Sequence, residues 1–409
     1  MGIWKTIKEG IQEILWRLYH LYLNEKMARI RRKNQIRFLF IVQELSQWKS
    51  EALYKAMLIH PRFTPILGVS PSLEYPGAEQ KVVDYIRSKG YTFFLLDPNK
   101  RISEQIDVDL LMHQKPYSKG ISPLHRIHKN LAIPTVYIPY YLSTITEGWL
   151  VNQRLCLLAW REFIDNEDCC NEWRKVQRLK GLNYAVTGLP IMDDLLSTKS
   201  DLKDVWPNND GRKRIIYAPH HTIGDYHLTG ISYSTFLVFA QFMLELRDKY
   251  QDQVYFVFKP HPLLYAKLID SYWGLEKTKA YYEAWNKPGH SHIEQNDSYL
   301  SLFKYSDALI HDCGSFTIEY LYTGNPVMYL IKDEHHKDNL NQTASHAFDL
   351  HYMGETKEDI EQFVQNVISG NDPYADKRDR FSKNVLLPPN GESACNNIMN
   401  AILGEGNYK

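Results

Sequence analysis

Apolar positions along the chain form short continuous runs that alternate with amphipathic stretches. Ile36–Val42 is an unbroken apolar run, as expected for a strand buried on both faces of a parallel sheet. Further predicted strands lie at 64–69, 91–96, 107–112, 134–138 and 184–190, with helices at 49–59 and 78–89. Strands and helices that alternate at this spacing predict a doubly wound parallel sheet.

The same alternation restarts in the second half of the chain. Strands are predicted at 214–218, 254–258, 308–310 and 326–330, and helices at 234–250, 357–369 and 392–403. Residues 197–213, with Ser, Asp, Asn, Pro and Gly, form the predicted linker. The chain thus predicts two doubly wound α/β domains, 34–196 and 214–390, that face one cleft and bind ligands at the carboxyl ends of their strands. A last helix within 391–409 could cross back to the first domain.

Residues 1–33 form a predicted amphipathic helix with a basic end. Its apolar stripe has helical spacing and consists of Ile3, Ile7, Ile11, Ile14, Leu18 and Tyr22, widened by Trp4, Leu15 and Leu21. Residues 1–37 hold nine Lys or Arg and three Glu, a net charge of +6 in a chain whose total is zero. This pattern fits binding in the plane of an anionic membrane. Packing on its own domain or on a second subunit is the alternative, and the tryptophans with the basic tail favour the membrane slightly.

Composition places the chain among globular proteins, with 44% hydrophobic and 23% charged residues over 409 positions. The five cysteines are odd in number and lack the spacing of a zinc site, which indicates a reduced, cytosolic protein. The start of the chain does not have the pattern of a signal peptide, and no apolar run approaches the ~20 residues of a membrane span. No nucleic-acid partner is expected.

Polar residues directly follow two of the predicted strands. Lys259 and His261 come after the run at 254–258, and His220 and His221 follow the preceding strand. A lysine or histidine in such a place can neutralise a phosphate, and a histidine can move a proton near neutral pH. An ordinary polar loop is the alternative for each stretch. The adjacent histidines lack a further ligand at a recognisable spacing, so no metal is expected.

A third strand, ending near residue 310, leads into a predicted helix start at 312–315. Free backbone N–H groups at a helix start favour an anion. Gly314 lets a ligand approach the backbone, Ser315 can bond a phosphate oxygen or simply cap the helix, and Glu319 could accept hydrogen bonds from a ribose or be solvated. Strand ends of this kind in one parallel sheet predict a diphosphate pocket, hence an enzyme with a nucleotide-activated donor and no cofactor. The candidate catalytic residues are His261 and His220, and the candidate donor-binding residues are Lys259, His221, Asp312, Gly314, Ser315 and Glu319.

Several stretches occur in an order that is typical of one enzyme family. They are Val186-Thr-Gly-Leu-Pro-Ile-Met-Asp193, Tyr217-Ala-Pro, Lys259-Pro-His-Pro262, Asp312-Cys-Gly-Ser-Phe-Thr-Ile-Glu319-Tyr and Asn390-Gly-Glu-Ser393. In them the chain resembles the CDP-glycerol glycerophosphotransferases that build teichoic acids and related bacterial capsule polymers. The resemblance covers the second half and implies a GT-B fold of two Rossmann-like domains, the C-terminal one binding the CDP moiety. It also implies peripheral attachment to the cytoplasmic face of the membrane, and contacts of His261 and Ser315 with the donor diphosphate.

Two departures from the family pattern concern the chemistry. The family usually has Asp-Tyr-Ser-Ser where this chain has Asp312-Cys-Gly-Ser315. Its teichoic acid branch carries Trp-His-Gly after the last N-terminal strand, with the histidine as the proposed base, whereas this chain has Val136-Tyr-Ile-Pro-Tyr-Tyr-Leu142 there. Tyr140 and Tyr141 are the candidate acceptor-side residues, although a tyrosine pKa near ~10 makes a poor base at neutral pH.

The leading interpretation is a transferase that moves glycerol phosphate, or a similar polyol phosphate, from a CDP-activated donor to a membrane-associated glycan or lipid-linked acceptor. A GT-B glycosyltransferase that uses a nucleotide sugar is the first alternative, and the missing Trp-His-Gly favours it somewhat. A non-catalytic scaffold of a polysaccharide assembly complex is the second, and such a protein should bind no nucleotide.

Overall fold

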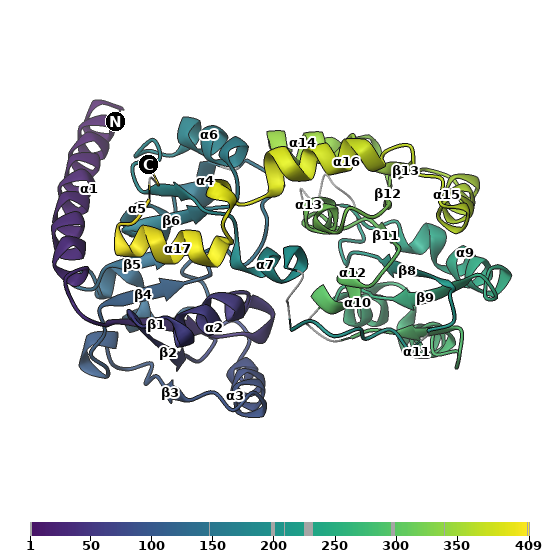
Figure 1. Ribbon diagram of the computed structural model, residues 1–409, viewed down its shortest axis with the longest axis horizontal. Coiled ribbons are helices and arrows are strands. Elements are labelled where there is room, and N and C mark those ends of the chain that lie inside the picture. The colour runs from purple at the N-terminus through teal and green to yellow at the C-terminus, as the bar shows by residue number, and fades with distance from the viewer. Residues whose placement is uncertain are drawn as a thin grey trace. The chain divides into compact units, whose positions relative to one another are not determined.

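The computed structural model describes residues 2–146, 148–197, 201–207, 209–224, 232–295, 299–338, 340–406 and 408, with side chains from residue 7 onward. The chain divides into two compact units, whose elements are labelled in Figure 1. The first unit takes in the chain up to Leu142, residues 146–193 and residues 386–409. The second takes in residues 143–145 and 194–385.

The first unit is built on a seven-stranded parallel sheet with the order β3-β2-β1-β4-β5-β6-β7. Its strands are β1 (Ile36–Val42), β2 (Phe63–Val69), β3 (Phe93–Leu95), β4 (Leu110–His113), β5 (Thr135–Tyr137), β6 (Arg161–Ile164) and β7 (Tyr184–Val186). Its helices are α1 (Gly2–Ile30), α2 (Glu51–Ile59), α3 (Ala78–Ser88), α4 (Gly148–Val151), α5 (Arg154–Leu158), α6 (Glu167–Val176) and α17 (Ala394–Leu403), and α7 (Pro190–Leu196) runs from this unit into the next. The direction of winding reverses between β1 and β4, and ligands of doubly wound sheets bind at the carboxyl ends of the strands at such a reversal.

The central strand β1 is buried on both faces, as its unbroken apolar run predicts. Side chains alternate across a strand, so Phe40 contacts Trp48 and Tyr54 on one face of the sheet. Leu39 and Ile41 point to the other face and join a second apolar cluster there. Such a strand is anchored along its length, which fixes the positions of the polar residues that follow it.

The second unit has a six-stranded parallel sheet with the order β10-β9-β8-β11-β12-β13. Its strands are β8 (Lys213–Ala218), β9 (Val254–Phe258), β10 (Ser291–Ile293), β11 (Ala308–His311), β12 (Val327–Leu330) and β13 (Tyr352–Gly354). Its helices are α9 (Phe236–Lys249), α10 (Leu264–Ser271), α11 (Gly274–Ala284), α12 (Leu300–Lys304), α13 (Phe316–Glu319), α14 (Gln342–Phe348), α15 (Lys357–Ser369) and α16 (Ala375–Phe381). Here the winding reverses between β8 and β11. Together the two parallel sheets confirm the predicted pair of doubly wound α/β folds.

The strands that carry the site of the second unit are held by an aromatic core. Phe258, the last residue of β9, stacks on Trp285 with ring centroids 5.0 Å apart, and Tyr217 of β8 stacks on Phe258 at 5.7 Å. Phe236, at the start of α9, joins the same cluster. Large buried rings supply much of the stabilisation of a core, so the ends of β8 and β9 are rigid.

Helix α1 has two apolar faces. Trp16, Tyr19, Leu23 and Met27 belong to the face that packs on the first unit, where Leu23 and Met27 are fully buried. The predicted stripe lies on the opposite face, and its described members are 46% to 65% exposed: Ile7, Ile11, Ile14, Leu15, Leu18, Leu21 and Tyr22. Both interpretations of the stripe had assigned it to a contact, and among the described residues it makes no contact that buries it. Among the residues that the structure describes, no helix combines the length and the apolarity that crossing a membrane requires.

The two units do not correspond to the two halves of the sequence at two segments, 201–207 and 386–409. Part of the predicted linker, 201–207, packs on the second unit, because the Trp206 indole is buried and donates a hydrogen bond to the Leu302 carbonyl at 3.1 Å. The chain returns to the first unit at Leu386, and α17 lies beside α2 (Figure 1). The first unit is therefore built from segments that lie far apart in the sequence.

Candidate active site

Three loops meet at the carboxyl ends of β9, β8 and β11, which are neighbours in the second sheet. Backbone hydrogen bonds join the first two loops, since the Lys259 N–H donates to Tyr217 O at 2.8 Å and the His261 N–H donates to Pro219 O at 3.0 Å. The Asp312 carboxylate accepts from the His220 N–H at 2.5 Å and thereby joins the third loop to the second. The predicted polar residues of all three strand ends therefore surround one point, at the reversal between β8 and β11.

Three histidines form a cluster at this point. The rings of His220 and His261 have centroids 4.9 Å apart, those of His221 and His261 4.2 Å, and those of His220 and His221 4.5 Å. All three are partly buried, and each offers a ring nitrogen within 4.8 Å of the others. No metal was expected, because no further ligand stands at a recognisable spacing from His220 and His221 in the sequence. That premise was wrong, since His261 supplies the third nitrogen.

Hydrogen bonds at Nδ1 hold two of these rings and set the tautomer of His261. The Leu263 N–H donates to Nδ1 of His261 at 3.1 Å, and the Thr222 N–H donates to Nδ1 of His220 at 3.3 Å. A neutral ring that accepts at Nδ1 carries its proton on Nε2. His261 therefore presents an N–H donor at Nε2, whereas a metal would need a lone pair there. Nδ1 of His220 also lies 2.9 Å from the Thr222 hydroxyl, which can donate or accept, so either tautomer of His220 is satisfied. The arrangement suits the oxygens of a phosphate better than a metal ion.

The three rings are neutral at physiological pH in this structure. Burial, followed by the neighbouring His221 and the Lys259 charge, lowers the pKa of His261 to about 3. Burial also lowers the pKa of His220 well below its usual range, with the nearby histidines adding to the effect, and lowers that of His221. The sequence analysis expected a histidine that moves protons near pH 7. With these shifts the rings are neutral near pH 7 and can donate hydrogen bonds, and proton transfer by His261 or His220 stays a prediction.

Two lysines supply positive charge around the histidines. Lys259 follows β9 directly and is 7% exposed. Lys267, on α10, lies close enough that its charge contributes to the lowered pKa of both His220 and His221. Lys267 was not among the predicted site residues. Its position in the helix that directly follows Lys259 and His261 could have indicated it. Both cations favour an anionic ligand at this point.

The buried carboxylate of Asp312 stabilises the site through hydrogen bonds from His220 and Thr235. It is fully buried, and its second carboxylate oxygen accepts from the Thr235 N–H at 2.6 Å and the Thr235 hydroxyl at 2.8 Å. Burial raises its pKa to about 6, while the bonds from Thr235 and His220 act in the opposite direction. The sequence analysis placed Asp312 among the donor-binding residues. Its bonds in the structure hold the His220 loop against the start of α9, and its contact with the donor stays a prediction.

The segment that follows Asp312 differs in part from the predicted helix start. Helix α13 spans only Phe316–Glu319 and continues as a 3₁₀ turn, so the dipole argument for an anion is weak here. Ser315 makes no capping hydrogen bond to this helix, which removes the alternative of plain capping. A Cβ added at Gly314 would make ordinary contacts with Thr144 and Tyr233, at 3.6 Å and 3.7 Å. Protein packing therefore does not require a glycine at this position.

Glu319 and Cys313 are both buried beside the site. Glu319 is 3% exposed and accepts a hydrogen bond from the Tyr299 hydroxyl, so the interpretation of a solvated carboxylate was wrong. Its proposed contact with a ribose stays a prediction. Burial raises the pKa of the Cys313 thiol well above its usual range, and its Sγ donates to Ala218 O at 3.3 Å. Cys313 is a small core residue, as predicted, and not a nucleophile.

The candidate acceptor-side residues lie in the first unit, just beyond β5. The hydroxyl groups of Tyr140 and Tyr117 are 3.1 Å apart, and the rings of Tyr140 and Tyr141 meet edge to face at 4.8 Å. Burial, followed by Tyr117, raises the pKa of Tyr140 far above its usual value. Tyr140 therefore cannot act as a base at neutral pH.

Two of the sequence stretches that carry the family resemblance meet in the first unit. The Asp193 carboxylate accepts from the N–H groups of Ala394 and Cys395, both at 2.8 Å, at the start of α17. Gly188 has a φ of +79°, and a Cβ there would lie 2.9 Å from Pro388. These residues join the end of β7 to the returning chain, so their part is in the fold and not in the chemistry.

Solved structures with this architecture across nearly the whole chain are enzymes of the GT-B type. A variant of the wall teichoic acid polymerase TagF matches with a TM-score of 0.63 at 12% identity, over 96% of this chain and 97% of that one. The S. aureus MnaA–UDP co-structure matches with 0.59 at 15% identity, over 90% and 96%. The UDP-GlcNAc 2-epimerase from Neisseria meningitidis, bound to UDP-GlcNAc, matches with 0.57 at 15% identity, over 90% and 100%. At such identities the likeness defines the fold, and the GT-B prediction is confirmed.

The family follows from the sequence itself. The family profile described as CDP-glycerol:poly(glycerophosphate) glycerophosphotransferase matches residues 164–404, more than half of the chain. The chain belongs to this family, and its identification as a glycerophosphotransferase-like transferase is confirmed. No curated protein has a significant sequence match to the chain.

Proposed function

We propose that the protein transfers glycerol phosphate from CDP-glycerol to a hydroxyl group of a glycan or lipid-linked acceptor at a membrane surface. Membership of the glycerophosphotransferase family supports the reaction type. The observation that carries the site assignment is the cluster of His220, His221 and His261 beside Lys259 at the ends of adjacent strands. TagF, which shares the fold, has a structure soaked with CDPG.

In the proposed reaction, the acceptor hydroxyl oxygen attacks the β-phosphorus of the donor. A new P–O bond forms while the bond from the β-phosphorus to the bridging oxygen breaks, and CMP leaves with that oxygen. The hydroxyl proton passes to water or to a base on the acceptor side. Negative charge grows on the leaving phosphate, and donors already in place lower the barrier by meeting it. His220 and His261 would donate from Nε2, and Lys259 and Lys267 would supply positive charge.

The proposed mechanism uses no metal ion. Two lysines and two Nε2–H groups meet the phosphate charge that a divalent cation neutralises in other phosphoryl-transfer enzymes. A metal bound at Nε2 of His261 would move the ring proton to Nδ1, where it would face the N–H group of Leu263. Such a clash of two donors disfavours metal binding, although the ring nitrogens lie close enough for it.

Peripheral attachment to the cytoplasmic face of an anionic membrane is part of the proposal. It is supported by the exposed apolar face of α1 and by the charge of +6 within residues 1–37. An amphipathic helix gains by burying its apolar face among acyl chains, and each nearby basic residue adds about 1 kcal/mol on an anionic surface. The opposite face of α1 packs on the first unit, so the helix would hold that unit at the membrane.

A second candidate function is sugar transfer from a nucleotide sugar. The absence of Trp-His-Gly near Tyr140 favours it, since the base of the glycerophosphotransferase reaction is then missing. The solved epimerase structures also share the fold, and one of them is bound to UDP-GlcNAc. In that case the acceptor would attack the anomeric carbon, and a nucleoside diphosphate would leave.

One experiment separates these functions. Purified protein is incubated with CDP-glycerol, CDP-ribitol, UDP-sugars and CMP-sugars, and the products are identified by mass spectrometry. The proposal expects CMP from CDP-glycerol, or from CDP-ribitol for a related polyol. If only a UDP-sugar is turned over, the protein is a glycosyltransferase and the proposal is wrong. Absence of turnover, together with no binding of CDP in calorimetry, would leave a scaffold protein.

A further inference from the structure

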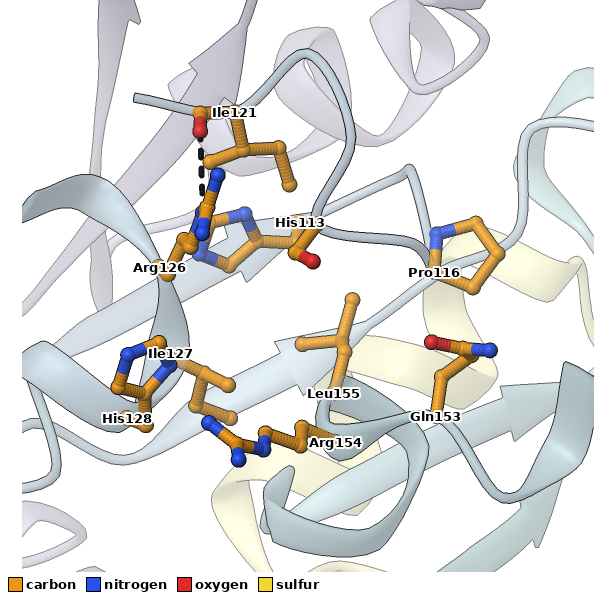
Figure 2. A pocket seen from close by; sticks show the side chains of 10 residues that line it. His113, Pro116, Ile121, Arg126, Ile127, His128, Gln153, Arg154 and Leu155 are labelled. Carbon is orange, nitrogen blue, oxygen red and sulfur yellow. Dashed lines mark hydrogen bonds between the residues drawn. The ribbon is translucent and has the colours of Figure 1, made fainter. Parts of the chain in front are cut away.

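A separate pocket of about 180 Å³ lies in the first unit (Figure 2). Three segments line it: the loop after β4, the short 3₁₀ helix Ile127–Lys129 with the residue before it, and the start of α5. The polar side chains His113, Arg126, His128 and Arg154 belong to this lining. The fold therefore brings together, in one pocket, polar side chains from parts of the chain that are not adjacent in sequence.

The lining carries positive charge without a carboxylate to balance it, since it includes neither Asp nor Glu. Arg126 donates from Nε to Ile121 O at 3.1 Å, the bond drawn in Figure 2. Among the described residues, neither Arg126 nor Arg154 forms an ion pair. Burial lowers the pKa of His128, and the charge of Arg154 lowers it further, so this guanidinium acts directly on the imidazole. An anion would relieve the mutual repulsion of these groups.

His113 is a second and independent sign of a missing ligand. It ends β4, is 3% exposed, and has no hydrogen-bond partner for Nε2 in the described part of the chain. Burial, followed by the neighbouring His125, lowers its pKa to about 4, so the ring is neutral at pH 7. A buried polar atom without a partner is costly. A ligand atom in the pocket would supply the partner.

The pocket lies beside the helix that carries the proposed membrane face. Ile127 and Leu155 line the pocket, and they also belong to the apolar cluster on which Trp16 and Tyr19 of α1 pack. The other face of α1 is exposed. If that face lies in a membrane, the pocket is close to the membrane surface and within reach of groups anchored there.

We propose that this pocket binds a phosphate group of the acceptor, through the guanidinium groups of Arg126 and Arg154 with His113 and His128. Guanidinium groups bind phosphate in a two-pronged geometry, which explains two of them in one small pocket. The assignment to the acceptor rests on the proposed function. The donor diphosphate is assigned to the second unit, so a phosphate site of the first unit serves the other substrate. The site selects an acceptor that bears a phosphate.

The first test measures binding of glycerol 3-phosphate and of inorganic phosphate by calorimetry, with and without saturating CDP. CDP fills the diphosphate site, so the binding that remains reports on the pocket. Arg154→Gln should weaken this binding at least tenfold. Arg154 is exposed and has no described hydrogen bond, so its replacement should not affect folding. Arg178→Gln, at another exposed arginine of the first unit, is the matched control and should bind as the wild type does.

The second test identifies the source of the phosphate. With a phosphate-bearing acceptor, Arg154→Gln should raise the acceptor KM at least tenfold and leave the KM of CDP-glycerol and the binding to anionic liposomes unchanged. If the variant instead loses liposome binding and keeps its acceptor KM, the pocket binds lipid headgroups. The assignment to the acceptor is then overturned. Equal phosphate binding by the wild type and Arg154→Gln, or none by either, would overturn the pocket itself. Binding of CDP and turnover of the donor are measured separately, so failure of the proposed function is seen independently.

Discussion

Replacing His261 with asparagine isolates the hydrogen bond on which the proposed donor site depends. In the structure, Nδ1 of His261 accepts the Leu263 N–H at 3.1 Å. The side-chain oxygen of an asparagine can take this place and keep the turn, whereas nothing then replaces the Nε2–H that faces the cluster. His261→Gln is the complementary change, because its amide N–H reaches about as far as Nε2.

The size of the effect follows from the bond that is lost. A hydrogen bond to a charged group contributes about 1.5–3 kcal/mol. At 1.36 kcal/mol per factor of ten, its loss lowers the rate by about one to two decades. We therefore expect kcat/KM of His261→Asn to fall at least tenfold, and His261→Gln to recover part of the loss.

The assay is release of CMP from CDP-glycerol, with thermal melting to show that each variant is folded. His346→Asn, at an exposed position on α14, is the control and should have wild-type kinetics. Wild-type kcat/KM in His261→Asn, with the correct donor established, would refute the assignment of His261 to the diphosphate. Equal losses in both His261 variants would mean that the ring shape, and not its Nε2–H, is required.

Four further outcomes are expected. Ser315→Ala removes a hydroxyl that the helix does not use as a cap, and turnover should fall at least tenfold by the same estimate of about 1.5–3 kcal/mol; wild-type turnover would exclude Ser315 from the donor site. EDTA should leave activity intact, and loss of activity that Mg²⁺ or Mn²⁺ restores would contradict the metal-free mechanism. Leu18→Glu on the exposed face of α1 should reduce sedimentation with anionic liposomes, whereas Leu58→Glu on α2, which is similarly exposed, should not; equal sedimentation of the two variants would end the membrane proposal. Stability should fall from pH 7 to pH 5, because burial lowers the pKa of His113 to about 4 and that of His351 to about 3, while the unfolded chain has the usual ~6.5. The unfolded state then binds protons that the folded state excludes, at a cost of about 2 kcal/mol per histidine at pH 5; urea unfolding that gives equal stability at both values would contradict this.

Long apolar runs made most of the sheet predictable. The prediction for β1 matches its bounds, and β9 and α15 were placed at their observed residues, because burial on both faces leaves a clear pattern. Strands β10 and β13 were missed, since each has only three residues and lies at an edge of its sheet. The stretch that contains β6 and α6 was judged irregular, because its strand is short and its helix begins with charged residues.

The sequence predicts which residues lie close together at the site better than it predicts what each of them does. Parallel strands place their carboxyl ends along one edge, so His220, His221 and His261 were expected together, and the structure brings them together. Pattern alone does not reveal that Asp312 is fully buried and bonded to His220 and Thr235. Lys267 was missed because it reaches the cluster from a helix, and a helix pattern shows which residues share a face without showing what that face meets.

The N-terminal helix shows the same limit. Its stripe was read correctly as one face, yet the residues that hold the helix on the first unit lie on the other side, among them Leu23 and Met27. Removing residues 1–33 would therefore expose core surface of that unit. Substitutions on the outer face test membrane binding more cleanly than the truncation does.

The bond between Asp193 and the start of α17 has a consequence for biosynthesis. The second unit is a continuous insertion apart from residues 143–145, whereas the first unit needs residues 386–409 to be complete. A ribosome delivers a chain from its N-terminus, and domains generally fold as units during synthesis. The first unit, although most of it is made earlier, must therefore wait until residues 386–409 have been made before the Asp193 carboxylate can accept from the N–H groups of Ala394 and Cys395. Until then α2 lacks the helix that packs beside it, and the insertion can fold ahead of the unit that surrounds it in sequence.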